Sequence, residues 1–207
     1  MKLVYAPGAC SIGIHFLMEE IGKPFTAERL DIKGGEQFQP QFAQLNPKSK
    51  VPTLVRDDES VLTEFPAIAL WLAKSNPEAG LIPSDLEGET RALEMLDYAV
   101  STIHMQGFSR IFRPVKFSPN EADHDAVRGM GTEIALKAFS NVSKVLADRK
   151  FIFGDHLSVA DAGLFYVHFW AIDRMRLSLP ENCVAYYARL KARPSAIKAF
   201  ATEGISI

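Results

Sequence analysis

The residue best suited to chemistry lies near the start of the chain, just after a proline-glycine turn. Cys10 belongs to the run Pro7-Gly8-Ala9-Cys10-Ser11, which follows a short apolar opening. An apolar run, a turn and an apolar-periodic segment predict a strand, a loop and a helix. We therefore expect the thiol at or just before a first helical turn, where free N–H groups and the helix dipole favour a thiolate on the residue or on a ligand. The alternative is a small buried side chain with a packing role.

Two later segments offer polar groups for an extended ligand. Val51-Pro52 opens a predicted strand, where a proline is tolerated because its missing N–H is not needed. A cis bond there would turn neighbouring backbone groups outward, and an ordinary trans edge proline is the alternative. Glu64-Phe65 precedes a predicted helix, so its carboxylate and the helix N–H groups suit a zwitterionic amino-acid head. A helix-capping region without a ligand is the alternative there.

A third group of residues is spaced to share one face of a predicted long helix. Its members are Asp97, Ser101, His104 and Phe108. Steps of four, three and four residues place them on a stripe that is offset by one position from the apolar stripe. The imidazole can titrate near neutral pH, which suits it to catalysis, whereas a merely solvated face is the alternative. The five histidines and two cysteines show no metal-binding spacing, so no metal is expected.

The elements that must position these residues change character along the chain. Up to about residue 80, short strands and helices alternate, as in α/β units. Strands are expected over 1–5, 25–32 and 61–62, and the loop over 46–55 is expected to run into a further strand. Helices are expected over 11–21 and 37–45, and a third is opened by residues 63–66 and runs to about residue 74. The predicted domains are 1–76 (α/β) and 85–207 (all-helical), joined by a linker at 77–84.

The second domain shows the periodicity of long helices. Two apolar stripes at steps of three and four predict buried faces. They comprise Leu93, Leu96, Val100, Ile103 and Gly107, and then Val127, Met130, Ile134, Ala138 and Val145. Segment 158–174 is apolar nearly all round and should be a central buried helix, entered through a capping box of Ser158 and Asp161. One more helix is expected over 184–191.

Composition excludes several classes of partner. A net charge of −2 over 207 residues gives no electrostatic basis for binding nucleic acid or an anionic membrane. No apolar stretch approaches the ~20 residues of a membrane span, and the opening lacks a signal-peptide pattern, so we expect a cytoplasmic protein. Cys10 and Cys183 form no Cys-x-x-Cys unit. A disulfide between them is left open, but a reducing compartment disfavours it.

Taken in order, these signals and several others resemble one family along essentially the whole chain. The matching segments are Met1-Lys2-Leu3, Pro7 to Ser11, Asn46-Pro47-Lys48, Val51-Pro52, Leu62-Thr63-Glu64, Ile103-His104, Gly107-Phe108, Gly154-Asp155, Ser158 to Ala162 and Arg193-Pro194. The ordered set is similar to the cytosolic glutathione transferases, and specifically to the bacterial beta class. This resemblance implies a thioredoxin-like N-terminal domain, an all-helical C-terminal domain and a homodimer.

The resemblance also implies a site for glutathione as co-substrate. The tripeptide would lie along Val51 and a cis Pro52, with its γ-glutamyl end at Glu64 and Phe65. Its sulfur would sit beside Cys10, with Ser11 and His104 near. The positions of Gly35, Asp97, Ser101 and Thr102 would line the site or reach across the dimer. Asp161 would be structural, as part of the capping box.

Four positions depart from the family's pattern. Phe65 stands in place of a serine, which removes a hydroxyl and leaves only the backbone N–H for the ligand. Gly35 replaces a lysine, Thr102 a glutamate and Met105 a lysine. Whether the nearby Lys33 substitutes for the first lysine is left open. Fewer charged anchors predict weaker binding of glutathione.

The implied activity is attack of the glutathione sulfur on a small hydrophobic electrophile, as in detoxification. Cys10, Ser11 and His104 are the expected catalytic residues, with Cys10 and Ser11 as hydrogen-bond donors to the sulfur. Phe108, Phe112 and Phe117 would contact the apolar co-substrate, although core packing explains them equally well. The alternatives are glutathione-dependent thiol-disulfide exchange through Cys10 and non-catalytic binding of hydrophobic ligands, because a fold does not fix a function.

Overall fold

The computed structural model describes residues 1–206 and divides into two compact units. Unit 1 holds residues 1–82 and 190–207, and unit 2 holds residues 83–189. Residues 190–207 thus belong with the first unit and not with the helical one, because α9 (Pro194–Thr202) packs against α1 (Ser11–Ile21). As limits of folding domains, 1–76, 77–84 and 85–207 stay a prediction.

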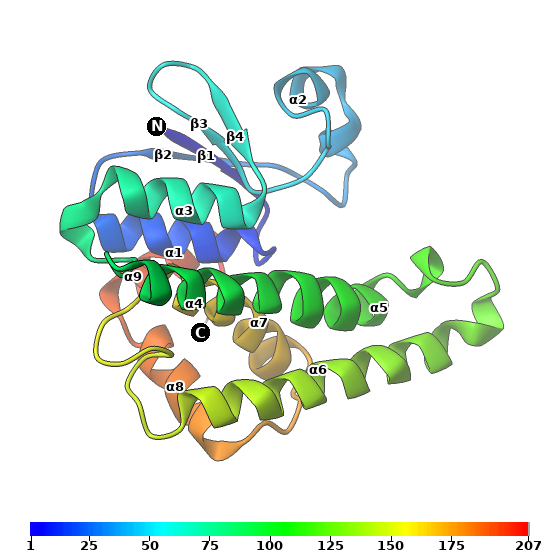
Figure 1. The fold of residues 1–207 in the computed structure, drawn as a ribbon. Coiled ribbons are helices and arrows are strands. Elements are labelled where there is room, and N and C mark those ends of the chain that lie inside the picture. The colour runs from blue at the N-terminus through cyan, green and yellow to red at the C-terminus, as the bar shows by residue number, and fades with distance from the viewer. Residues whose placement is uncertain (207) are drawn as a thin grey trace. The chain divides into compact units, whose positions relative to one another are not determined.

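Unit 1 is built on a four-stranded mixed sheet. In sheet order its strands are β2 (Thr26–Arg29), β1 (Lys2–Tyr5), β3 (Thr53–Val55) and β4 (Val61–Thr63). Strand β1 runs parallel to β2 and antiparallel to β3, so that Leu3 pairs with both Ala27 and Leu54. Helices α1 and α3 (Phe65–Ser75) lie side by side next to this sheet (Figure 1). This is the thioredoxin-like arrangement expected for the first domain.

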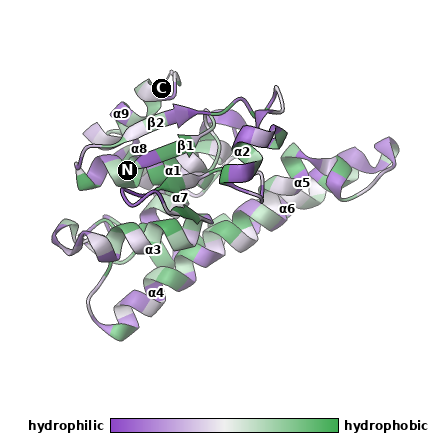
Figure 2. Cartoon of the chain, turned by 90° about the horizontal axis from the view of Figure 1, so that it is seen from above, coloured by the Kyte–Doolittle hydropathy of each residue, from purple (hydrophilic) through white to green (hydrophobic). Residues whose placement is uncertain are grey.

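The first helix follows the sequence rules closely. Helix α1 covers the predicted span, and it ends at Gly22, whose φ of 74° lets its N–H donate to the Met18 carbonyl oxygen at 3.1 Å. Its residues are mostly hydrophobic, as the green of α1 in Figure 2 shows. Helix α3 over 65–75 likewise confirms the expected helix.

Two predicted elements of unit 1 differ from the structure in extent. The strand expected over 25–32 is only Thr26–Arg29, because β2 pairs solely with the four residues of β1. The helix expected over 37–45 consists of η1 (Glu36–Phe38) and α2 (Pro40–Leu45). Pro40 has no N–H to continue the earlier turn, so it opens a new helix. A further short turn, η2 (Pro77–Ala79), follows α3.

Unit 2 is helical throughout its regular elements. They are α4 (Leu86–Asp97), η3 (Tyr98–Phe108), α5 (Ser109–Phe112), η4 (Pro114–Lys116), η5 (Glu121–Asp123), α6 (His124–Leu146), α7 (Val159–Phe169) and η6 (Trp170–Arg174). Helix α8 (Glu181–Lys191) confirms the expected last segment and leads into unit 1. The path through η3 and α5 runs alongside α6 (Figure 1), whereas α4 packs against α7.

The middle of that path is a π-helix, and this changes which residues share a face. At the end of η3, the Ser109 N–H donates to the His104 carbonyl oxygen, five residues back. Asp97 and Ser101 are exposed, whereas Phe108 is fully buried. The predicted common face of the group is therefore wrong, because a π-turn advances each residue by a smaller angle than an α-turn.

The close packing of η3 on α6 also shifts the second apolar stripe. A Cβ added to Gly131 would lie 2.7 Å from the Gly107 carbonyl oxygen, so only glycine permits this approach. The buried positions of α6 include Gly131, Ala135 and Phe139. Met130, predicted to be buried, is instead 54% exposed. Ala138 is buried as predicted, so the stripe is displaced by one residue only where α6 approaches η3, because Gly131 and Ala135 and not larger side chains line that contact.

Helix α7 forms the centre of unit 2, as predicted. All of its residues are buried. The capping box is present: Asp161 accepts hydrogen bonds from the Ser158 N–H at 2.7 Å and hydroxyl at 2.9 Å. The same carboxylate accepts from the Tyr186 hydroxyl at 2.6 Å and from the Ile152 N–H at 2.9 Å. Asp161 thereby ties the start of α7 to two other segments.

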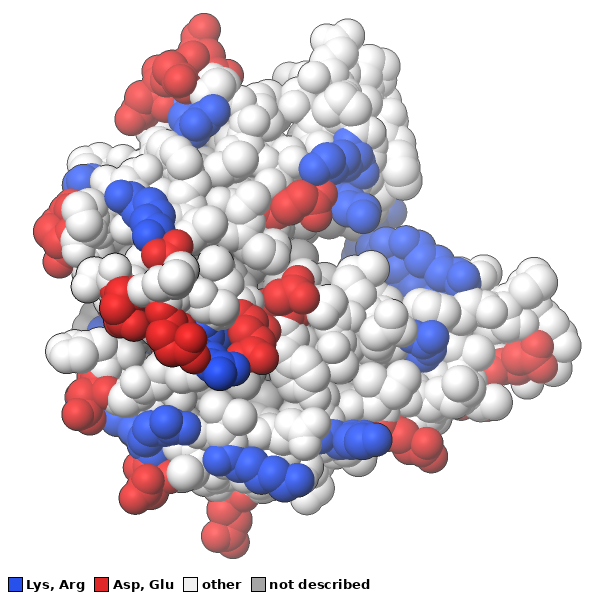
Figure 3. All heavy atoms as spheres, in the orientation of Figure 1, with Lys and Arg blue, Asp and Glu red and all other residues white. Residues whose placement is uncertain are grey.

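The surface carries charges of both signs. On the face drawn in Figure 3, acidic and basic side chains are interspersed, in keeping with the small net charge. Across residues 1–206, none of the helices has both the length and the apolar character to cross a membrane.

Candidate functional site

The thiol of Cys10 lies at the start of α1, where the sequence predicts it. Cys10 is the N-cap residue of that helix and is partly exposed. Its Sγ lies 3.5 Å from the Val51 carbonyl oxygen and donates a hydrogen bond to it. The helix start and the Val51-Pro52 loop, far apart in sequence, therefore meet within unit 1.

The electrostatic surroundings keep this thiol protonated. Burial raises the pKa of Cys10 to about 12, and the carboxylates of Glu203 and Glu64 act in the same direction. Hydrogen bonds from the backbone N–H groups of Cys10 and Ser11 lower the pKa, but by less. A thiolate on Cys10 itself, one of the two expectations for this helix start, is thus disfavoured. A protonated Cys10 is a hydrogen-bond donor for another sulfur.

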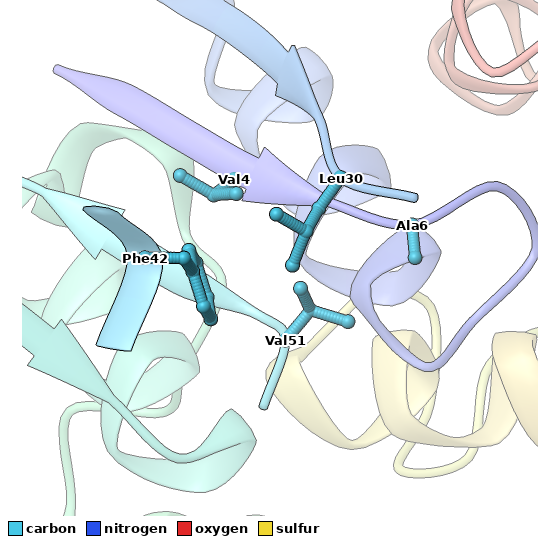
Figure 4. Packing of buried hydrophobic residues seen from close by; sticks show 5 residues of the cluster. All are labelled: Val4, Ala6, Leu30, Phe42 and Val51. Carbon is cyan, nitrogen blue, oxygen red and sulfur yellow. The ribbon is translucent and has the colours of Figure 1, made fainter. Parts of the chain in front are cut away.

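The loop opposite the thiol is fixed by apolar packing. Val51 belongs to a buried cluster whose other members are Val4, Ala6, Leu30 and Phe42 (Figure 4). Phe42 comes from α2 and Val4 from β1, so this cluster fills the space between that helix and the sheet. The Val51-Pro52 peptide bond is cis, which confirms the geometry implied by the resemblance.

Glu64 presents its carboxylate at the start of α3. It is the N-cap residue, but its side chain forms no cap hydrogen bond and instead binds Lys48 Nζ at 2.9 Å. Its φ of 72° lies in the left-handed region, which costs a non-glycine residue of order 1 kcal/mol or more and is common at functional sites. Glu64 is exposed. The carboxylate is therefore available to a ligand's ammonium group, in exchange for or beside Lys48.

For three other predicted residues of unit 1, the structure does not directly indicate contact with a ligand. Phe65 is buried, so its ring belongs to the core and not to the ligand side. The Ser11 hydroxyl is buried and engaged by Ala6, lying 3.3 Å from its nitrogen and 3.4 Å from its oxygen. Gly35 begins η1 with a φ of 83° and open space around it. Ligand roles for these three residues stay predictions.

The sequence rules missed a residue that positions the thiol loop. Glu203, just beyond α9, is buried and accepts hydrogen bonds from the Gly8 N–H at 2.8 Å and from His15 Nδ1, 3.0 Å away. Gly8 has a φ of 66° and lies two residues before Cys10. The carboxylate thus holds both the loop before the thiol and the helix after it. No local pattern could have indicated this, because the partners are 195 and 188 residues apart.

In unit 2, His104 lies among aromatic rings. Its Nδ1 is 3.3 Å from the Tyr166 hydroxyl oxygen, and its ring meets Trp170 edge-on at a centroid distance of 4.7 Å. Phe112 stacks on Phe108 at 5.5 Å and contacts Trp170 at 5.4 Å. Imidazole and rings thus form one aromatic cluster on η3, α5 and the junction of α7 with η6.

The predicted site residues therefore fall into two sets. In unit 1 lie Cys10, Ser11, Gly35, Val51, Pro52, Glu64 and Phe65. In unit 2 lie Asp97, Ser101, Thr102 and His104. Of these, the geometry directly joins Cys10 with Val51. Both cysteines are free thiols, and within residues 1–206 no three metal-ligating side chains cluster.

Two family models match the chain. The model for the glutathione S-transferase N-terminal domain covers residues 8–75, and the model for the C-terminal domain covers residues 108–204. Together they account for most of the sequence and span parts of both units.

Individual proteins agree with these matches. Glutathione S-transferase GstA of Escherichia coli O157:H7 is 35% identical, over 99% of this chain and 100% of that protein. A sphingomonad glutathione S-transferase complexed with glutathione is 30% identical with a TM-score of 0.85, and the match covers 100% of both chains. A beta-class enzyme from Sphingomonas chungbukensis is also 30% identical, with a TM-score of 0.84 and the same coverage.

Proposed function

Because the chain belongs to the glutathione S-transferase family, we propose that it conjugates glutathione to small hydrophobic electrophiles. One observation carries this proposal: the Cys10 Sγ lies 3.5 Å from the carbonyl oxygen of Val51, next to the cis bond to Pro52. A thiol donor thus faces the backbone of the loop that leads into β3, and this loop can offer hydrogen bonds to a tripeptide with a central sulfur.

Each group of unit 1 then has a role toward glutathione. The backbone of Val51 binds the cysteinyl part of the tripeptide, and Glu64 binds the γ-glutamyl ammonium. The Phe65 backbone N–H binds the adjoining carboxylate, because its ring is committed to the core. The start of α1 and the Cys10 S–H group stabilise the developing thiolate.

The reaction is a nucleophilic substitution or addition by the glutathione sulfur. A new carbon–sulfur bond forms, the thiol proton goes to solvent, and in a substitution the leaving group departs with its electron pair. An ordinary thiol with a pKa near 8.5 is only about 3% ionised at pH 7. Lowering that pKa by about two units makes the thiolate predominant, and this is the main catalytic task of unit 1.

Several finer features belong to the same proposal. We assign the chain to the bacterial beta class, as a cytoplasmic homodimer, on the strength of its sequence motifs and the 30% identity to a beta-class structure. His104 orients the sulfur or polarises the reactants, and Asp97, Ser101 and Thr102 act in binding within the dimer. Gly35 marks the position where the family's lysine anchor is missing.

The test combines binding and turnover. Glutathione at millimolar concentration should raise the melting temperature and give heat in a calorimetric titration, and S-methylglutathione should do the same. Conjugation is then followed with 1-chloro-2,4-dinitrobenzene. Binding of neither peptide would overturn the proposal, because an enzyme of this kind must hold glutathione at working concentrations.

Product analysis separates conjugation from thiol-disulfide exchange. The exchange reaction passes through a mixed disulfide on Cys10, so a Cys10→Ala variant must lose it completely. Conjugation should survive in that variant at a reduced rate. If the chain reduces disulfides but forms no thioether with any electrophile, exchange is the activity and conjugation is not.

A further inference from the structure

One segment of unit 2 combines exposed rings with an excess of positive charge. Between Tyr98 and Asn120 the sequence contains no aspartate or glutamate, while Arg110, Arg113 and Lys116 fall close together. The cations belong to α5 and η4 and to the residue that joins them. In Figure 3, blue atoms gather near the end of α5. The segment is thus locally cationic in a protein whose net charge is −2.

The aromatic part of the segment is both exposed and held in place. Phe112 and Phe117 are 43% and 41% exposed, although large apolar side chains are usually buried. Phe112 cannot turn freely, because it stacks on Phe108 at 5.5 Å and contacts Trp170 at 5.4 Å. A fixed, half-exposed ring supported from below is suited to stacking against a flat aromatic ligand.

The cations differ in how they are engaged. The Arg110 guanidinium lies 4.3 Å from the centroid of the Phe117 ring and donates to the Gln106 carbonyl and side-chain oxygens at 2.8 Å. By contrast, none of the ion pairs or side-chain hydrogen bonds within residues 1–206 involves the side chain of Arg113 or Lys116, and both residues are exposed.

Some cations elsewhere on the surface have an acidic neighbour. Arg91 binds both Glu87 and Glu94 at 2.9 Å, and Lys23 binds Glu78 at 3.0 Å. The segment around α5 lacks such neighbours because its sequence has no acid to supply them. Its two exposed cations, neither of which is in an ion pair with a carboxylate, therefore give a local excess of positive charge beside the exposed rings.

We propose that this segment selects aromatic electrophiles that carry a carboxylate. The rings of Phe112 and Phe117 contact the aromatic body, and Arg113 and Lys116 bind the anionic group, for which a guanidinium offers a planar pair of donors. This inference rests on the proposed conjugation and names its substrate class. It makes Arg113 and Lys116 specificity-determining residues.

The test uses two electrophiles that differ only in charge. They are 4-chloro-3,5-dinitrobenzoate and the matching benzamide. In both, the glutathione sulfur bonds to the ring carbon that carries the chlorine, chloride leaves with the bonding electron pair, and the thiol proton passes to the buffer. We expect the wild-type ratio of kcat/KM, carboxylate over amide, to fall about tenfold in Arg113→Gln/Lys116→Gln, with the amide rate unchanged. Added salt should lower the wild-type ratio as well.

The control is a double variant with the same change of charge in the same unit. Lys137→Gln/Lys144→Gln alters two exposed lysines of α6 and should leave the ratio at its wild-type value. An unchanged ratio in the Arg113/Lys116 variant, or an equal fall in the control, would overturn the proposal.

A binding experiment separates this proposal from the proposed reaction. The unreactive 3,5-dinitrobenzoate and 3,5-dinitrobenzamide lack a leaving group, so their affinities report on unit 2 without any chemistry. We expect tighter binding of the benzoate, and loss of that preference in the Arg113/Lys116 variant. If the protein binds the benzoate more tightly but does not turn over either electrophile, the proposed conjugation is refuted and the selectivity is not. If the benzoate and the benzamide bind with equal affinity, the selectivity is refuted.

Discussion

Histidines in the two units are held in different ways. In unit 1, His15 is buried against a carboxylate, with Nδ1 3.0 Å from Glu203. In unit 2, His104 and His168 are surrounded by rings. The ring centroid of His104 lies 4.7 Å from that of Trp170, and the ring centroid of His168 lies 4.7 Å from that of Phe139. Ring contacts occur in both units, since the ring of His15 also lies 5.5 Å from that of Tyr5 and 5.7 Å from that of Phe25. The polar partners differ: His15 has a carboxylate, whereas His104 has a tyrosine hydroxyl and His168 a backbone carbonyl.

This difference matches the two kinds of ligand that a transferase handles. Backbone groups and a buried carboxylate give the Cys10 loop one geometry, which suits a co-substrate of constant structure. Stacked rings bind through area and shape, and few polar atoms restrict what they accept. The comparison predicts that polar substitutions around the Cys10 loop change stability and glutathione binding, whereas the aromatic cluster of unit 2 responds through packing and through the exposed cations beside it.

The largest effect is expected from removing the carboxylate of unit 1. Glu203→Ala leaves the Gly8 N–H and His15 without their acceptor, and each buried polar group left unsatisfied costs about 1–3 kcal/mol. Urea unfolding measures this loss. Glu203→Gln keeps an oxygen for Gly8 and should be clearly milder. If both variants lose the same small amount, below about 1 kcal/mol, the carboxylate does not hold the loop.

The next effect concerns the buried histidine of unit 2. Burial lowers the pKa of His168 to about 4, and a hydrogen bond to the Leu164 carbonyl only partly opposes this. In the unfolded chain the pKa is near 6.5. Because the folded pKa is the lower one, this stabilisation is complete above pH 6.5 and is lost as the pH falls through 4, by roughly 3 kcal/mol in total.

Unfolding free energies at pH 7 and pH 4.5 test this prediction. His168→Phe keeps a ring against Phe139 and Tyr186 but removes the titrating group. Its loss of stability between the two pH values should be smaller than that of the wild type. An identical loss in both proteins would assign the acid sensitivity to other groups.

A smaller effect is expected where unit 1 meets the γ-glutamyl group. Glu64→Gln removes the charge that binds the ligand's ammonium, which should raise the KM for glutathione about tenfold and leave the KM for the electrophile unchanged. Glu59→Gln, at another exposed acid with a positive φ, is the matched control. A rise in both KM values would indicate general damage to the unit.

The smallest effect on conjugation is expected at the thiol itself. With a pKa of about 12, Cys10 stays protonated between pH 6 and 9 and contributes one hydrogen bond. Cys10→Ala should lower kcat/KM by about fivefold, the value of one modest hydrogen bond. The pH profile of kcat/KM should keep its midpoint, because only the glutathione thiol titrates in that range. A displaced midpoint would mean that Cys10 ionises during catalysis.

Local rules predicted much of the fold. The start and end of α1, the N-cap position of Cys10 and the capping box of Ser158 with Asp161 depend on residues a few positions apart. Such short-range signals can be recognised in a single sequence. The cis bond before Pro52 came only through the family resemblance, because nothing local distinguishes it from a trans bond.

Long-range contacts and the type of helix could not be predicted from such local patterns. Glu203 meets Gly8 across nearly the whole chain, and no spacing rule links them. The π-helical η3 moved Phe108 away from the exposed Asp97 and Ser101, since the spacing rule assumes α-helical turns throughout. Met130 was misplaced because glycine, at Gly131, and not a large apolar residue marks the contact with η3.

The assembly of unit 1 from distant parts of the chain has a consequence for biosynthesis. Gly8 and Glu203 are 195 residues apart. At ~5–20 residues per second, a ribosome needs roughly 10–40 s to make the second after the first. Throughout that time the nascent thiol loop lacks the carboxylate that fixes it, while the whole of unit 2 emerges. The residues around Gly8 are thus translated well before Glu203, yet they are among the last to reach their final conformation.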